Sequence, residues 1–299
     1  MTRAIITNGA HQTLGEGIAG PSNPLRVGVN SAAAAVREAF DKACDDARVQ
    51  RAEIVAAEIG LAGVRRADVR ISVYNALRVL GINELEVVTD ADIALFGATN
   101  GEPGLVIIAG TGSICCGRSA RGKRVCAGGW GPLAGDEGSG AWIARQALQA
   151  VARASDGRGP TTLLVRAACA YFNVPQPEDL SMAIYAPSMT NDRIAGFGKQ
   201  VVEAAQGGDA VALAIIFRAG RELGTAASAV IRGLRMEREK FQVAYVGGVF
   251  KAGELLLKPL RQEITRRASK AYLAPPLMSP VVAAARMAHE HRGHIALAV

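Results

Sequence analysis

The second half of the chain opens with a strand, a glycine turn, a second strand, a short turn and a third strand, in that order. The first of these strands, residues 105–109 (Leu-Val-Ile-Ile-Ala), is entirely apolar and runs into Gly110–Ser113 (Gly-Thr-Gly-Ser). Strands are expected again through Cys115-Cys116 and over residues 124–127. Apolar runs bounded by glycine turns are typical of strands. This stretch is therefore predicted to begin a second structural unit.

The first half of the chain alternates strand and helix patterns. Predicted strands occupy residues 4–7, 12–16, 53–61 and 84–89, and predicted helices occupy residues 31–48 and 67–80. Helices are expected to dominate residues 139–233, before a β-α-β pattern at residues 242–246, 253–268 and 271–273 and a last helix over 281–291. Alternation of this kind predicts an α/β fold with a largely parallel sheet.

A length of 299 residues favours two lobes over one. We predict an N-terminal lobe at residues 1–97 and a C-terminal lobe at residues 98–299, with a hinge close to residues 96–103. If the two halves are duplicates, a strand and a glycine turn equivalent to those that open the second half should precede Thr2. Without them, one edge of the first sheet would lack its neighbour.

Composition narrows the classes of function. Hydrophobic residues make up 49% of the chain and charged residues 20%, as in soluble globular proteins. The net charge of +7 suits an anionic ligand, but no arginine-rich run interleaved with aromatic residues is present, so nucleic-acid binding is not expected. No apolar run approaches the roughly 20 residues of a membrane span, and no signal-peptide pattern is found. We expect a cytoplasmic protein without a membrane partner.

The five cysteines are an odd number and contain no CxxC pair. They are expected to be small, buried thiols in a reducing compartment. The adjacent Cys115 and Cys116 should face opposite sides of their strand. His289, His291 and His294 lie close together in sequence, but their terminal segment is rich in arginine, and no metal site is predicted there.

The glycine turn at residues 110–113 has the composition of a phosphate-binding loop. Glycines let the backbone come close to an anion, and the hydroxyls of Thr111 and Ser113 can donate to phosphate oxygens. An ordinary hairpin turn has the same composition, so both interpretations stay open on this motif alone.

A second glycine-rich segment precedes the helix predicted from Ser139. Five of the eleven residues from 128 to 138 are glycine. Trp130 offers an apolar ring of the kind that stacks on a sugar. Asp136 and Glu137 can cap the helix that follows. Capping explains neither the tryptophan nor the glycines, so a ligand site is favoured here.

Two further positions follow predicted strands directly. Asp90 ends the strand at residues 84–89, and ligands of open α/β sheets bind beyond the carboxyl ends of strands. Asp90 can also cap the helix that follows, although Asp92 can serve that role. Gly247-Gly248 lie between a strand and a helix, which fits a nucleotide contact or a plain strand-to-helix turn.

Taken in order, these segments resemble the N-acetylglucosamine kinases and the broader BadF/BadG-type ATPase family, within the sugar kinase, Hsp70 and actin superfold. The most specific match is Gly-Gly-Trp-Gly followed by Gly-Asp-Glu-Gly-Ser, at residues 128–131 and 135–139. The other matching segments are residues 22–23, 60–63, 89–91, 107–113, 195–197, 246–250 and 279–285. The resemblance implies a duplicated, ribonuclease H-like α/β fold whose two lobes close on ATP and a sugar, with Mg²⁺ bridging the phosphates.

The resemblance also implies the reaction and its residues. An amino sugar, N-acetylglucosamine or glucosamine, would be phosphorylated at its 6-hydroxyl, with Asp90 as general base. ATP would be bound by Gly110, Thr111, Gly112, Ser113, Gly247 and Gly248. The sugar would be bound by Asn23, Asp90, Gly129, Trp130 and Asp136, so a cleft lined by Asp90, Thr111, Trp130 and Asp136 is expected. A homodimer is left open.

The sequence departs from the family pattern in three ways. The family opens with a strand and an Asp-Gly-Gly-Gly-Thr-type turn, which is not found ahead of Thr2, so weak kinase activity is expected of this form. Ala62 and Ile114 stand where vertebrate-type kinases carry serine and asparagine. Both changes remove hydrogen bonds to a sugar, which leaves glucosamine or another hexose open as the substrate.

Two other classes of protein remain alternatives. One is the activator ATPase of 2-hydroxyacyl-CoA dehydratases, whose dimer shares an iron–sulfur cluster. That class needs cysteines beside glycine turns in a characteristic context, which neither Cys126 nor Cys169 supplies. The other is a non-catalytic relative that binds a sugar or a nucleotide.

Overall fold

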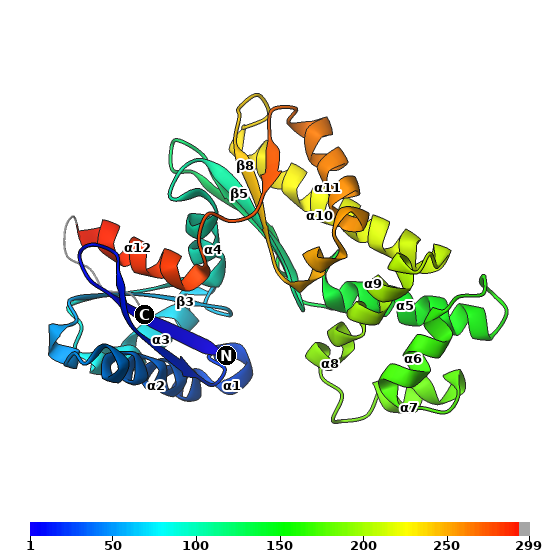
Figure 1. Cartoon of the computed structure of the whole chain (residues 1–299), viewed down its shortest axis with the longest axis horizontal. Coiled ribbons are helices and arrows are strands. Elements are labelled where there is room, and N and C mark those ends of the chain that lie inside the picture. Colours follow the sequence, from blue (N-terminus) through cyan, green and yellow to red (C-terminus); the bar gives the residue numbers. More distant parts are fainter. Residues whose placement is uncertain (293–299) are drawn as a thin grey trace. The chain divides into compact units, whose positions relative to one another are not determined.

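The computed structural model describes residues 1–292, with side chains to residue 290. The chain forms two compact units (Figure 1). Unit 1 contains Met1–Glu102 and the segment that begins at Pro276, and unit 2 contains Pro103–Pro275. We expected the last helix in the second lobe. It belongs to unit 1 because its alanine-rich face packs with residues of β1, β3 and α4.

Unit 1 is an α/β unit with a β-hairpin and a parallel strand pair. Its strands are β1 (Thr2–Thr7), β2 (Thr13–Ala19), β3 (Ala56–Leu61) and β4 (Glu84–Thr89). Its helices are α1 (Pro24–Val27), α2 (Val29–Ala47), α3 (Ala67–Leu77), α4 (Asp90–Thr99) and α12 (Pro280–Arg292), with short 3-10 turns at Arg51–Glu53 and Arg78–Leu80. β1 pairs with β2 in antiparallel fashion, and β3 pairs with β4 in parallel. The strand predicted at 53–61 begins later, because the Glu53 carboxylate accepts from the N–H of Gln50 and closes a capped turn.

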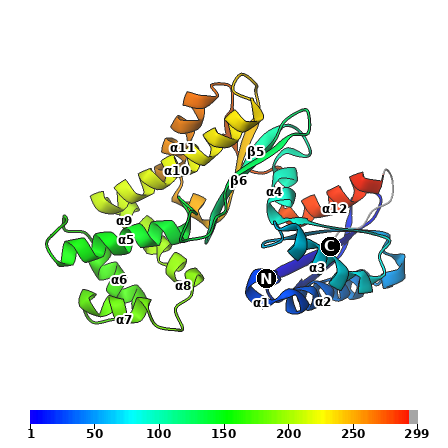
Figure 2. The same ribbon diagram turned by 180° about the vertical axis from the view of Figure 1, so that it is seen from behind.

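β1 and β3 lie between the same two layers of helices. On one face, Ile6 of β1 and Ile59 of β3 share a core with Phe40 of α2. On the other face, Ile5 and Ala56 share a core with α4 and α12. Figures 1 and 2 show β1 between α2 and α12. Among the described residues, β1 pairs only with β2, and β3 pairs only with β4. β1 and β3 are therefore not hydrogen-bonded to each other, although the same helices cover both strands.

Unit 2 is built on a mixed five-stranded sheet in the order β7-β6-β5-β8-β9. Its strands are β5 (Gly104–Ala109), β6 (Ser113–Arg118), β7 (Arg124–Gly128), β8 (Gln242–Val246) and β9 (Tyr272–Ala274). Its helices are α5 (Gly140–Ser155), α6 (Leu164–Phe172), α7 (Leu180–Ile184), α8 (Asn191–Gly196), α9 (Gly198–Gln206), α10 (Ala210–Leu234) and α11 (Glu254–Arg267). Two 3-10 turns occupy Pro177–Asp179 and Gly248–Ala252. β5, β8 and β9 run parallel, whereas β6 and β7 are antiparallel to their neighbours.

The core of unit 2 lies between this sheet and α10. The apolar side chains of Leu105 and Ile107 on β5 are fully buried there with Leu223 and Ile231 of α10. The sequence prediction of an α/β fold is confirmed in both units. In unit 2 the parallel strands β5 and β8 bring the turns at their carboxyl ends to one edge of the sheet.

The expectation that all five cysteines are free thiols is wrong for two of them. Cys116 and Cys126 form a disulfide with a Cα–Cα distance of 4.1 Å. They are directly paired in the register of β6 and β7, which sequence spacing alone did not reveal. Cys44, Cys115 and Cys169 are free.

Two further expectations concern membranes and metals. Over residues 1–292, no single helix is long and apolar enough to span a membrane, although the bent pair Asn191–Gln206 and Ala210–Leu234 passes on length and composition. Within the described part of the chain, no group of three or more histidine, cysteine or acidic side chains could hold a metal ion. The His291 side chain and His294 lie outside that part, and His289 Nε2 lies 3.2 Å from the hydroxyl of Thr7.

Candidate active site

The glycine turn between β5 and β6 is held against the first turn of α5. The N–H of Gly140 donates to the carbonyl of Gly110 (2.8 Å), and the N–H of Ala141 donates to that of Thr111 (3.2 Å). Within the turn, Gly110 N–H donates to the carbonyl of Gly112 (2.9 Å). No acceptor is found among residues 1–292 for the N–H groups of Thr111 and Gly112. Two backbone donors therefore remain for an anion.

The two hydroxyls of this turn have different partners. Ser113 is buried, and its hydroxyl donates to the carbonyl of Glu137 (2.8 Å). The Thr111 hydroxyl donates to a carboxylate oxygen of Asp192 on α8 (2.8 Å). We predicted that both hydroxyls would donate to phosphate oxygens. The Ser113 hydroxyl instead joins the turn to the second glycine-rich segment. Asp192 was missed, because neither a glycine turn nor a strand end marks it.

Asp136 connects the two glycine-rich segments. Its carboxylate accepts hydrogen bonds from the N–H groups of Ser113 and Gly131, and its side chain is 6% exposed. Burial raises the pKa of this carboxyl, whereas the two N–H donors lower it. The residue adopts a left-handed φ of 57°. A Cβ on Gly112 would lie 2.7 Å from Asp136 Oδ2, which explains the glycine at that position.

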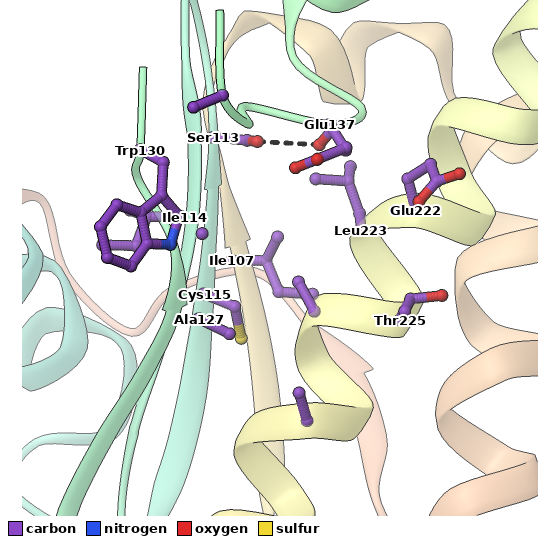
Figure 3. Close-up of a pocket in the computed structure, with 14 residues that line it drawn as sticks. Ile107, Ser113, Ile114, Cys115, Ala127, Trp130, Glu137, Glu222, Leu223 and Thr225 are labelled. Atoms are coloured by element: carbon purple, nitrogen blue, oxygen red, sulfur yellow. Dashed lines mark hydrogen bonds between the residues drawn. The ribbon is translucent and has the colours of Figure 1, made fainter. Parts of the chain in front are cut away.

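Trp130 is 72% exposed and follows the end of β7. The preceding Gly129 has a left-handed φ of 73° and donates its N–H to the carbonyl of Ser113 (2.9 Å). Figure 3 shows the Trp130 ring beside Ile114, across the strands from Leu223 of α10. An exposed indole ring held by a glycine turn is of the kind that stacks on a ligand ring.

A cavity of about 270 Å³ lies between the sheet and α10. Its lining is mostly apolar and includes Ile107, Cys115, Leu223 and Ala226. Trp130 and four polar residues, Ser113, Glu137, Glu222 and Thr225, also line it.

Gly247 and Gly248 lie beside the phosphate-loop candidate. Gly247 follows β8 with a left-handed φ of 123°. A Cβ there would lie 2.2 Å from the carbonyl oxygen of Ala109, the residue just before Gly110. The structure thus brings two of the predicted nucleotide-binding segments together at the carboxyl ends of β5 and β8.

Unit 1 holds the remaining two predicted residues, Asn23 and Asp90. Asn23 caps α1 by accepting from the N–H of Leu25 (3.0 Å), and its Oδ1 would lie 2.4 Å from a Cβ on Gly63. Gly63 comes two residues after β3, whose last residue is paired with the last residue of β4. Asp90 follows β4 directly. Both side chains therefore belong to the carboxyl edge of the β3–β4 pair.

Asp90 is the first residue of α4 and is not its cap. Thr89 caps the helix by accepting from the N–H of Asp92, and Asp92 in turn accepts from Thr89. The Asp90 side chain reaches solvent, yet the surrounding protein excludes enough water to raise the pKa of its carboxyl. The N–H of Ala91, which donates to Oδ1 (2.9 Å), opposes that rise. A carboxylate without a capping role and with a raised pKa is suited to accept a proton.

The fold is that of the actin-like ATPases, to which sugar kinases belong. A crystal structure named as a candidate N-acetylglucosamine kinase of Chromobacterium violaceum matches with a TM-score of 0.76 and 28% identity, over 91% of this chain and 90% of that one. A ROK family glucokinase of Streptomyces griseus, solved with glucose and AMPPNP, shares the fold with a TM-score of 0.57 and 19% identity, over 97% of this chain and 99% of that one.

Residues 1–287 match the BadF/BadG/BcrA/BcrD ATPase family, and the chain belongs to that family. It is 37% identical over 192 residues to the N-acetylmuramic acid/N-acetylglucosamine kinase of Clostridium acetobutylicum. The aligned segment covers 64% of this chain and 63% of that protein. The chain is 32% identical over 235 residues to the N-acetyl-D-glucosamine kinase of Dictyostelium discoideum, which covers 77% of this chain and 74% of that protein. The match thus spans less than two thirds of the length of the Clostridium relative.

Proposed function

We propose that this protein phosphorylates an amino sugar at its 6-hydroxyl with ATP, and that N-acetylglucosamine or glucosamine is the substrate. The placement of Asp90 carries the proposal. This carboxylate directly follows β4, is not the N-cap of α4, and has a pKa raised by the surrounding protein. Relatives named as kinases of N-acetylglucosamine and N-acetylmuramic acid support the choice of sugar. Because the reaction uses ATP, we place it in the cytoplasm.

In this proposal Asp90 accepts the proton of the sugar hydroxyl as its oxygen attacks the γ-phosphorus in line. The N–H groups of Thr111 and Gly112 donate hydrogen bonds to the phosphate oxygens. Gly247 and Gly248 lie against the nucleotide at the same edge of the sheet. Trp130 stacks on the sugar ring. Asp136 holds the two glycine-rich segments together through its bonds to Ser113 and Gly131.

ATP fits the residues present, because the turn at 110–113 offers free backbone donors beside glycines that allow close approach. Mg²⁺ would neutralise phosphate charge in the reaction. In the described part of the chain no cluster of three acidic, cysteine or histidine side chains is available to hold it. The ion would therefore be bound chiefly by the phosphates and water, as is usual for Mg²⁺ at nucleotides.

The test is the substitution Asp90→Asn, assayed by ADP release and by calorimetry. The amide keeps the shape of the side chain and loses the proton acceptor. Turnover should fall by roughly 10² to 10⁴, while sugar affinity is kept. Asp68→Asn, an exposed substitution at the start of α3, is the matched control in unit 1 and should turn over normally. Normal turnover in Asp90→Asn would show that another group is the base.

The substrate is resolved by comparing N-acetylglucosamine, N-acetylmuramic acid, glucosamine and glucose in the same assay. Binding of a sugar without ADP release would favour the non-catalytic class. Iron in the purified protein would favour the activator class. Among the described cysteines Cys126 is bonded to Cys116, Cys44 and Cys115 are buried, and only Cys169 is a free and partly exposed thiol, which does not suit a shared cluster.

A further inference from the structure

The hydroxyl of Thr111 and the carboxylate of Asp192 are joined across 81 residues of sequence by a 2.8 Å hydrogen bond. Asp192 lies in the first turn of α8, which Thr190 caps by accepting from the N–H of Arg193. Asp192 has no role in the reaction proposed above. Its acidic side chain nevertheless contacts the loop that is proposed to bind the phosphates of ATP.

The fold fixes α8 in this place. A Cβ on Gly140, the first residue of α5, would lie 3.1 Å from the carbonyl oxygen of Gly110 and 3.3 Å from that of Ala195 on α8. The hydroxyl of Tyr171 on α6 donates to the carbonyl of Arg193 (2.7 Å). α8 therefore packs on Gly140, whose N–H is also hydrogen-bonded to the glycine turn. The helices around Asp192 thus hold it beside Thr111.

A threonine hydroxyl has one proton to donate. A carboxylate and a phosphate oxygen are both strong acceptors for it, and only one can receive it. The carboxylate also repels a polyphosphate that approaches the same hydroxyl. At about 4 Å in water, one pair of like charges changes an affinity by about fivefold.

We propose that Asp192 is a positioning residue that competes with nucleotide phosphate for the Thr111 hydroxyl. The carboxylate holds the hydroxyl and so links α8 to the glycine turn. A bound polyphosphate takes the hydroxyl, and the side-chain bond between α8 and the turn is lost. The inference rests on the function proposed above, since it takes residues 110–113 as the phosphate loop.

The first test measures the affinity for AMPPNP without Mg²⁺ by calorimetry in the full chain. Asp192→Asn should bind AMPPNP about fivefold more tightly than the unsubstituted protein, with unchanged sugar affinity. Asp192→Glu keeps the charge and should bind as the unsubstituted protein does. Glu178→Gln removes an exposed charge from the same helical region and is the matched control. In a Thr111→Val background, which removes the contested hydroxyl, the part of the gain from Asp192→Asn that comes from competition for the hydroxyl should be lost, and only the part from charge repulsion should remain.

Equal or weaker binding in Asp192→Asn would overturn the inference and leave the proposed function intact. Absence of AMPPNP binding in the unsubstituted protein would overturn both. A second measurement needs no substitution. Hydrogen exchange of residues 191–196 should become faster when AMPPNP binds, because α8 loses its bond to the turn. Slower or unchanged exchange of these residues in the AMPPNP complex would refute the loss of the Thr111–Asp192 bond on nucleotide binding.

Discussion

The contact between Gly112 and Asp136 predicts a sharp difference between two alanine substitutions in one turn. A Cβ at Gly112 would lie 2.7 Å from Asp136 Oδ2 and 3.1 Å from its Cγ. The carboxylate cannot easily move away, because the N–H groups of Ser113 and Gly131 hold it. Gly112→Ala should therefore destabilise the protein by about 1 to 3 kcal/mol, the usual cost of overpacking. It should also weaken nucleotide binding by displacing the Ser113 bond.

The matched control is Gly110→Ala, since a Cβ there would meet no atom within 4 Å and its φ is not left-handed. Urea unfolding should show Gly110→Ala within about 0.5 kcal/mol of the unsubstituted protein. The double variant Gly112→Ala/Asp136→Ala removes the clashing carboxylate. Its loss should be clearly smaller than the sum of the two single losses. Additive losses, or equal stability of the Gly110 and Gly112 variants, would refute this account of the turn.

Three further predictions concern stacking, the disulfide and pH. Trp130→Ala should weaken sugar binding by roughly 1 to 3 kcal/mol in calorimetry and leave AMPPNP binding unchanged; equal losses would make Trp130 a structural residue. Cys126→Ser should lower the unfolding free energy by about 2 to 3 kcal/mol relative to oxidised protein, and reduction of the Cys116–Cys126 bond should do the same. Burial raises the folded-state pKa of Asp136, so its protonated form is favoured by folding. Stability relative to Asp136→Asn should therefore be highest at low pH and fall as pH rises from about 4 through the raised pKa; a difference independent of pH in urea unfolding would contradict this.

The strands and turns that carry the candidate site follow local sequence patterns, and their positions were predicted from the sequence. The apolar strand before Gly110 and the strand before Gly247 are seen as β5 and β8, and parallel pairing sets their turns side by side. Asp90 follows β4 as expected, and the cap falls to Thr89 and Asp92. Each of these features depends on residues within a few positions of one another.

The features that the sequence did not predict all depend on pairing between distant segments. The Cys116–Cys126 bond requires the register of β6 and β7, in which these two residues lie opposite each other. The contact from Thr111 to Asp192 requires α8 to pack on α5. The grouping of α12 with unit 1 requires its alanines to fit between β1, β3 and α4. None of these pairings leaves a pattern in the local sequence. The cleft expected to contain both Asp90 and Asp136 stays a prediction.

The residue after the glycine turn bears on which sugar is accepted. A Cβ on Gly129 would lie 3.0 Å from Cδ1 of Ile114, so the isoleucine side chain lies directly under the backbone that leads to Trp130. An asparagine at this position, as in the vertebrate-type kinases, would offer an amide there instead. Ile114 offers only an apolar surface, which supports the tryptophan loop by contact and makes no hydrogen bond to an N-acetyl group. Selection for the N-acetyl group must then come from other polar groups of the protein around the sugar ring. Where these are too few, glucosamine and N-acetylglucosamine should be phosphorylated with similar efficiency.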